Sequence, residues 1–266
     1  MTTEVTLTVD ADGVALIRLD GGDDLNFFSS ATGRALGAAF ETCDTDDTVR
    51  AVVLTGSGSA FCAGADLSPG SGAFADPGAA FSASPVQPPA WQVRKLVVAA
   101  LNGHAIGIGL TLALQCDLRI VALDAKLAIP QVRRGMIGDA QSHFTLRRLA
   151  GTAIAADLLL TGRILSGAEA AARGIATEAL PTIEVLPAAM ERARDVALNV
   201  SPAALALSKE ILWADGSAEQ VAEAETRAHR RLMSHVDAAE GPAAWRERRA
   251  PQWSLRVSDL PRNARG

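Results

Sequence analysis

Apolar positions first alternate with polar ones and then form continuous runs, a pattern typical of a sheet whose inner strands are buried. Val5, Leu7 and Val9 alternate with polar residues, whereas 14–19 (VALIRL) is almost wholly apolar. The turn signal Asp-Ala-Asp-Gly lies between them, so residues 3–20 are predicted to form a β-hairpin. Other apolar runs of strand length predict the remaining strands at 49–55, 96–101, 118–122 and 125–130.

Helical patterns separate these strands and fill the last third of the chain. Ser29 or Ser30 can cap a helix that ends near Cys43, and a helix from about 90 leads to the strand at 96–101. Residues 131–138 are predicted to be a loop. Further helices are predicted from about 140 to Gly151, at 152–161, from a Ser166–Glu169 capping box to Gly174, and at 184–199, 201–213, 217–238 and 241–249. The order predicts an α/β fold with a helical C-terminal region.

Composition narrows the functional classes. A 266-residue chain with 48% hydrophobic and 21% charged residues can bury a full core. The net charge of −5 and pI near 5.4 argue against nucleic acid as a partner. The three cysteines, 43, 62 and 116, lack metal-ligand spacing, so no metal site is predicted, and a reduced cytoplasmic setting is the simplest. Because no stretch has signal or membrane-span character, no membrane association is expected.

Glycines follow two of the predicted strands, in the segments where the chain leaves each strand; we call these segments strand exits. The run at 96–101 ends in Asn-Gly and restarts as an apolar helix within 102–117 (NGHAIGIGLTLALQCD). The first N–H groups of a helix lack internal partners, and glycines let an outside group approach them, so this is either an anion or oxyanion site or simply a glycine-softened turn. The second exit is at 56–67. Neither has the spacing of a dinucleotide or phosphate loop, and no GxSxG elbow occurs. The irregular segment 68–90 is predicted to be a lid or binding loop, or disordered.

Together, these exits resemble the crotonase (enoyl-CoA hydratase/isomerase) family. The matching stretches are 60–67 (AFCAGADL), 102–109 (NGHAIGIG), Cys116-Asp117, 160–170, 173–176, 240–241 and 245–251 (WRERRAP). The resemblance implies a spiral core of repeated ββα turns that binds acyl-CoA over 1–199, and a C-terminal helical trimerisation region over 200–266. It also implies a homotrimer or homohexamer and an acyl-CoA thioester substrate, with no cofactor besides the coenzyme A of that substrate.

By motif position, the resemblance assigns the N–H groups of Ala65 and Ile108 to an oxyanion hole that holds the thioester oxygen of an enolate. The neighbouring residues would line the substrate site: Ala63, Gly64, Asp66, Leu67, Gly107, Gly109, Thr111 and Gln131. Asp66 also fits a cap for the following helix. The basic tail residues Arg246, Arg248 and Arg249 either reach a CoA phosphate of a neighbouring subunit or form a solvated helix face.

The sequence departs from the family at the catalytic side chains. Hydratases of the family use two glutamates, and the corresponding positions here are Thr111 and Gln131, neither of which is a general base near neutral pH. Asp139, eight residues after Gln131, resembles the acidic site of dienoyl-CoA isomerases, some enoyl-CoA isomerases and 4-chlorobenzoyl-CoA dehalogenase. It is either a proton shuttle or the N-cap of the following helix.

These residues favour an enzyme that isomerises the double bond of a fatty acyl-CoA, with Asp139 as the proton shuttle. Two alternatives remain at this stage. One is hydration of a 2-enoyl-CoA, with water held by Thr111, Gln131 and Asp139. The other is a CoA-ester-binding protein without turnover, which the two missing glutamates suggest.

Overall fold

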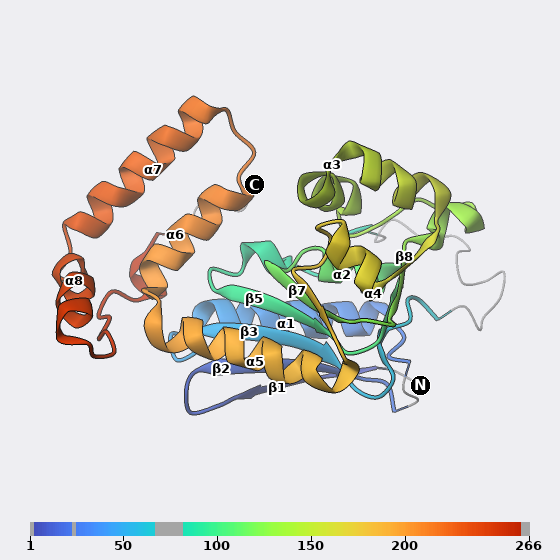
Figure 1. Ribbon diagram of the computed structural model, residues 1–266, viewed down its shortest axis with the longest axis horizontal. Helices are drawn as coiled ribbons and strands as arrows, with labels where there is room; N and C mark the ends of the chain where they lie inside the picture. Colours follow the sequence, from blue (N-terminus) through green and yellow to red (C-terminus); the bar gives the residue numbers. More distant parts are fainter. Residues whose placement is uncertain (1–2, 23–24, 67–81, 262–266) are drawn as a thin grey trace.

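The strands form two sheets, and strands that follow one another along the chain often belong to different sheets (Figure 1). The computed structural model describes residues 3–22, 25–66 and 82–261. Its larger sheet has the order β1-β2-β3-β5-β7-β10, and its smaller sheet has the order β4-β6-β8-β9. The consecutive pairs β3/β4, β5/β6 and β7/β8 each give one strand to either sheet. This repeated step gives the core its spiral form.

Most pairings in both sheets are parallel. The larger sheet contains β1 (Glu4–Val9), β2 (Val14–Asp20), β3 (Ala51–Gly56), β5 (Leu96–Leu101), β7 (Leu118–Ala122) and β10 (Glu178–Leu180). The smaller sheet contains β4 (Ala60–Cys62), β6 (His104–Ile106), β8 (Lys126–Ala128) and β9 (Ile164–Ser166). Only the predicted hairpin β1–β2 and the edge pair β8–β9 are antiparallel among these strands. The buried strand β3 has no exposed residue, as expected inside a parallel sheet.

Two of the helices begin at caps that the sequence predicts. They are α1 (Ser30–Thr45), α2 (Ile108–Ala113), α3 (Ser142–Thr161), α4 (Gly167–Ala172), α5 (Thr182–Asn199), α6 (Pro202–Trp213), α7 (Ala218–Met233) and α8 (Asp237–Glu247). Ser29 caps α1, and the predicted capping box of Ser166 and Glu169 starts α4. Gly151 has a φ of 78° and interrupts α3, which confirms that two helical pieces meet there.

Small side chains let α5 pack closely on the larger sheet. Its buried positions are Val185, Ala189, Ala193 and Ala197, spaced four residues apart on one face. This face packs against β3, β5 and β7, and Figure 1 shows α5 crossing these strands. The helix α1 packs against β1, and its Leu36 and Phe40 are almost completely buried.

The last three helices extend away from this core (Figure 1). They have their own small apolar cluster, in which Ala203 and Ala206 of α6 pack with tail residues Leu255, Val257 and Leu260. The helix α7 has no buried residue. The role of residues 200–266 in oligomerisation stays a prediction.

Asp117 joins the C-terminal helices to the core. Its Oδ2 accepts hydrogen bonds from Lys209 Nζ at 2.6 Å and from the Val97 N–H at 2.8 Å, while its Oδ1 accepts one from Trp213 Nε1 at 2.8 Å. Lys209 and Asp117 have only 6% and 9% exposed side chains. Because a buried charge is costly without its partner, this pair fixes α6 against β5.

Local structure differs from the sequence-based prediction in several short elements. The helix predicted from about 90 is only a 3₁₀ turn, η2 (Ala90–Gln92), and the loop predicted at 131–138 begins as another, η3 (Pro130–Arg134). The strand β6 lies between the Asn-Gly turn and α2, where a direct restart as helix was predicted. Three strands, β4, β9 and β10, and the 3₁₀ turn η4 (Val257–Asp259) were not predicted. All are three to five residues long, too short for a periodic signal.

The cysteines are buried and unpaired. Within the described residues, no helix has both the length and the apolar character needed to cross a bilayer. The predicted lid at 68–90 lies largely outside the described residues, and its described end contains η2.

We predict that Asp117→Asn lowers the free energy of unfolding by about 3–5 kcal/mol, because it leaves the Lys209 ammonium buried without its anion. Asp215→Asn is the matched control, since Asp215 pairs with Arg148 but is 82% exposed, and it should change stability by less than about 0.5 kcal/mol. Urea unfolding measures both. Equal effects of the two substitutions would contradict this account of the junction.

Candidate active site

The two glycine-bearing strand exits lie side by side. Strand β4 pairs in parallel with β6, with Ala60 opposite His104 and Cys62 opposite Ala105. A Cβ on Gly109 would overlap the carbonyl oxygen of Cys62, and one on Gly64 would lie 2.9 Å from the carbonyl oxygen of Ile106. The backbones of the two segments therefore touch where any larger residue would separate them.

This packing leaves two main-chain donors at the exits. Ile108 is the first residue of α2, so its N–H has no partner inside the helix. The preceding Gly107 has a φ of 57° and donates its own N–H to Ala128 O. Ala65 is exposed and follows Gly64, whose φ is 98°. No hydrogen bond within the described residues uses the N–H of Ala65 or of Ile108. Both are available to a bound oxygen.

Asp139 does not cap α3, and the N-cap interpretation of this residue is wrong. The N-cap of α3 is Gln141, which makes no side-chain capping hydrogen bond. The Asp139 side chain instead points to α2 and η3, where its Oδ1 accepts a hydrogen bond from Thr111 Oγ1 at 2.5 Å and its Oδ2 accepts one from Gln131 Nε2 at 3.3 Å. The three side chains that the sequence singled out as site candidates are thus in direct contact.

The carboxyl group of Asp139 is partly buried and lacks a cationic partner among the described residues. Burial raises its pKa above the ordinary value, while the hydrogen bonds from Thr111 and Gln131 oppose the rise. The charge of Asp139 also contributes to the pKa of the Cys62 thiol, which burial raises to about 11. Cys62 is therefore a protonated packing residue, and Asp139 lies near the strand exits.

A strained turn directs Asp139 away from the helix end. Ala140 and Gln141 have φ angles of 44° and 52°, a left-handed conformation that costs a non-glycine residue about 1 kcal/mol or more. Buried Gln115, which lies just after the end of α2, holds the turn, because its Nε2 donates to Ala140 O at 3.0 Å and to Gln141 Oε1 at 2.9 Å. The Gln141 amide in turn donates to Ser84 Oγ. No sequence motif identified Gln115 or this turn.

The remaining predicted site residues lie near the donors. Ala63 donates its N–H to Leu25 O at 2.8 Å, and Gly64 O accepts from the Phe28 N–H at 2.8 Å. Thr111 is fully buried, and Gln131 is half-buried with an Oε1 that has no described partner. Asp66 is exposed, and Leu67 and the helix that Asp66 was predicted to cap lie outside the described residues.

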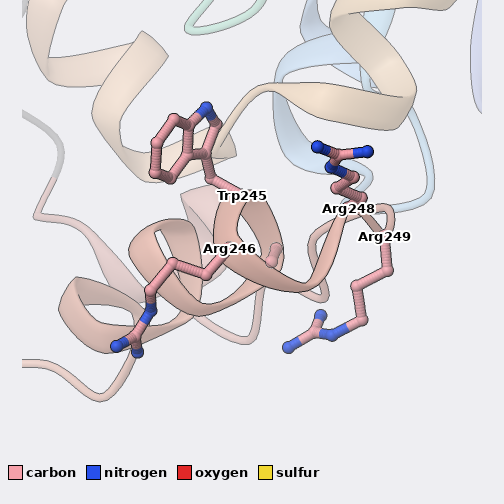
Figure 2. A pocket seen from close by; sticks show the side chains of 5 residues that line it. Trp245, Arg246, Arg248 and Arg249 are labelled. Atoms are coloured by element: carbon pink, nitrogen blue, oxygen red, sulfur yellow. The ribbon is translucent and has the colours of Figure 1, made fainter.

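A hollow of about 670 Å³ lies at the end of α8, away from the residues described above. It is lined by Ala244, Trp245, Arg246, Arg248 and Arg249 (Figure 2). Figure 2 shows Trp245 and Arg248 extending to one side of the helix end and Arg246 and Arg249 to the other. Arg249 forms a bidentate pair with Glu240, which lowers the Glu240 pKa to about 2. Trp245 is 82% exposed, and its indole extends to the same side of the helix end as Arg248.

Comparison with known proteins identifies the family. Residues 10–256 match the family model of enoyl-CoA hydratase/isomerase. The chain belongs to the enoyl-CoA hydratase/isomerase family. It is 32% identical to an enoyl-CoA hydratase of Alternaria alternata over 92% of this chain and 84% of that protein. It is 33% identical to a carnitinyl-CoA dehydratase of Proteus mirabilis, over 87% and 91% of the two chains.

A solved structure also resembles this chain over nearly its whole length. A crystal structure of a probable enoyl-CoA hydratase/isomerase from Mycobacterium abscessus is 49% identical, with a TM-score of 0.92 over 95% of this chain and 99% of that chain. The predicted crotonase fold and the assignment to a hydratase- or isomerase-type enzyme are confirmed. Membership of the enoyl-CoA hydratase/isomerase family does not by itself select between the two reactions.

No group of three or more His, Cys, Asp or Glu residues that could hold a metal ion occurs in the part of the chain that the structure describes.

We predict that Gly109→Ala destabilises the fold, although a Gly→Ala change inside a helix ordinarily stabilises by about 1 kcal/mol. The new methyl group would overlap Cys62 O and force α2 away from β4. Gly241→Ala in α8 is the matched control, because its Cβ would meet only the Trp253 ring at 3.3 Å and should be tolerated. Thermal unfolding compares the two variants. A Gly109→Ala protein as stable as the wild type would refute the close backbone contact.

Proposed function

We propose that this enzyme isomerises the double bond of a fatty acyl-CoA by moving a proton between two carbons through Asp139. One observation carries the proposal: the Asp139 carboxylate lies partly buried, without a cation among the described residues, in contact with the helix that starts at Ile108. A carboxyl group in such surroundings is a better base than one in water.

The two free donors supply the other half of the reaction. Removal of a proton next to a thioester leaves negative charge on the thioester oxygen, and the N–H groups of Ala65 and Ile108 are the proposed donors to that oxygen. One such preorganised donor is worth about 3–4 kcal/mol of barrier. Main-chain groups can therefore stabilise the enolate while Asp139 transfers the proton.

Hydration of a 2-enoyl-CoA is the second candidate. The relatives named above are a hydratase and a dehydratase, and both names imply the addition or removal of water. In this chain, water would be held by Thr111, Gln131 and Asp139. The contacts favour isomerisation, because Thr111 and Gln131 donate to Asp139 and contribute no second carboxylate.

The wider setting forms part of the same proposal. The substrate is an acyl-CoA, whose coenzyme A is the only cofactor-like group required, and the core over 1–199 binds it. Residues 200–266 mediate assembly into a homotrimer or homohexamer. The exposed apolar side chains of this region, Leu212, Met233, Val236 and Trp245, are consistent with contact between subunits. A cytoplasmic location and the absence of nucleic-acid and membrane partners complete it.

Asp139→Asn should reduce isomerase turnover by at least about 100-fold, because the amide cannot accept the proton. Binding of the CoA ester, measured by titration calorimetry, should remain close to that of the wild type. Asp215→Asn, which changes an exposed carboxylate paired with Arg148 on the surface, serves as the control and should retain turnover. Full activity of Asp139→Asn would disprove the proposal.

The same variant should be more stable than the wild type near neutral pH. Because the pKa of Asp139 is raised by burial, the ionised carboxylate costs folding energy above its folded-state pKa. The cost should disappear as the pH falls below about 4, where the carboxyl group is protonated in both the folded and unfolded states. Unfolding of the two proteins across this pH range measures the difference. A constant difference at all pH values would contradict the assigned cause.

The reaction class is decided by the products. Incubation with crotonyl-CoA should give no 3-hydroxyacyl-CoA, whereas a 3-enoyl-CoA should be converted to the 2-enoyl isomer. Mass spectrometry separates the outcomes, because hydration adds the mass of water and isomerisation leaves the mass unchanged. Rapid formation of the hydroxy product from crotonyl-CoA would favour hydration instead.

The basic residues at the end of α8 give a test of CoA binding. If Arg248 contacts a CoA phosphate of a neighbouring subunit, Arg248→Ala should raise KM about 10-fold while kcat stays unchanged, as expected for a lost charge-assisted hydrogen bond. Arg246→Ala is the control, since Arg246 extends to the other side of the helix (Figure 2). Equal KM values for the two variants would assign the basic tail to a solvated surface.

A further inference from the structure

Thr111 lies one helical turn after Ile108 on α2 and has no exposed surface. Its Oγ1 is 2.5 Å from Asp139 Oδ1 and 3.2 Å from the carbonyl oxygen of Ile108. A hydroxyl group has one proton to donate. The shorter distance and the negative charge of the carboxylate direct that proton to Asp139 Oδ1.

The two oxygens of Asp139 are therefore not equivalent. Oδ1 is held by the short hydrogen bond from Thr111, whereas Oδ2 has a longer one of 3.3 Å from Gln131 Nε2. Hydrogen bonds to a carboxylate weaken steeply as they lengthen, so Oδ2 keeps more of its capacity to accept a proton. The contacts thus distinguish an anchored oxygen from a reactive one.

We propose that Thr111 is a positioning residue that anchors Asp139 through Oδ1, so that Oδ2 is the atom that takes the substrate proton and returns it. This inference rests on the proposed isomerase function. In the first step a lone pair of Oδ2 takes the proton, and the C–H electron pair enters the enolate, whose charge lies on the thioester oxygen. In the second step Oδ2–H returns the proton to the other carbon, so nothing is oxidised or reduced.

The location of Thr111 on α2 gives this contact a further effect. The same rigid turn carries the Ile108 N–H, one of the two proposed oxyanion donors. A hydrogen bond from this turn therefore sets the distance between the proton acceptor and the oxyanion hole. Fixed geometry of this kind lowers the barrier without tightening substrate binding. Thr111 should accordingly affect kcat much more than KM.

The decisive variants are Thr111→Val, which removes the hydroxyl group, and Thr111→Ser, which retains it. In Thr111→Val, kcat should fall about 10- to 100-fold with KM nearly unchanged, which corresponds to the loss of one charge-assisted hydrogen bond. In a plot of kcat against pH, the acid limb should move to higher pH by about one unit or more. The reason is that Asp139 loses a hydrogen bond that favours its ionised form. Thr111→Ser should restore both kcat and the limb.

Thr145→Val is the matched control for packing. Thr145 of α3 is also fully buried, and among the described residues its hydroxyl has only the carbonyl oxygens of Gln141 and Ser142 as possible acceptors. This control should leave the acid limb in place. If Thr111→Val does not fold, Thr111→Ala takes its place in the same comparison with Thr111→Ser.

A wild-type kcat and acid limb in the variant without the hydroxyl group would overturn the inference, and so would a Thr111→Ser protein as impaired as that variant. A failure of the proposed isomerase function gives a different result, because Asp139→Asn would then retain turnover. If Asp139→Asn is inactive while Thr111→Val behaves as the wild type, only the role of Thr111 is rejected.

Discussion

The active site depends on the direct contact of two backbone segments, β4 and the start of α2. Gly64 and Gly109 allow this contact, since a Cβ on either would press against a carbonyl oxygen of the facing segment. The parallel pairing of β4 with β6 sets the register between the segments. The N–H groups of Ala65 and Ile108 belong to these segments, so the fold sets the relative position of the two proposed oxyanion donors before any substrate binds.

Asp139 completes this arrangement at a cost in stability. Its carboxylate is partly buried, and the turn that directs it contains two left-handed non-glycine residues, Ala140 and Gln141. Buried Gln115, just after the end of α2, compensates by donating hydrogen bonds to that turn. Strain and desolvation at a single residue, supported by a neighbouring helix, are common where a fold maintains a reactive group. Thr111 of α2 and Gln115 just after α2 thus support the proposed base, and α2 also carries the proposed donor at Ile108.

The sequence predicted the long elements well, because hairpin, buried strands and capped helices have strong local signals. It also predicted the glycine-bearing exits and singled out Asp139, whose role in the reaction stays a prediction. It did not reveal the second sheet, since β9 is only three residues long and its pairing with β8 depends on distant contacts. The capping prediction for Asp139 failed because an Asp before a helical pattern is usually a cap, and only the tertiary contacts with Thr111 and Gln131 show its different orientation.

The most direct test of the account is a crystal structure with a bound, unreactive acyl-CoA analogue. The account predicts the thioester oxygen within about 3.1 Å of both the Ala65 and Ile108 nitrogens. It also predicts Asp139 Oδ2 within about 3.2 Å of the carbon that loses the proton. A thioester oxygen bound elsewhere, or an Asp139 side chain turned toward the end of α3, would contradict the proposed mechanism.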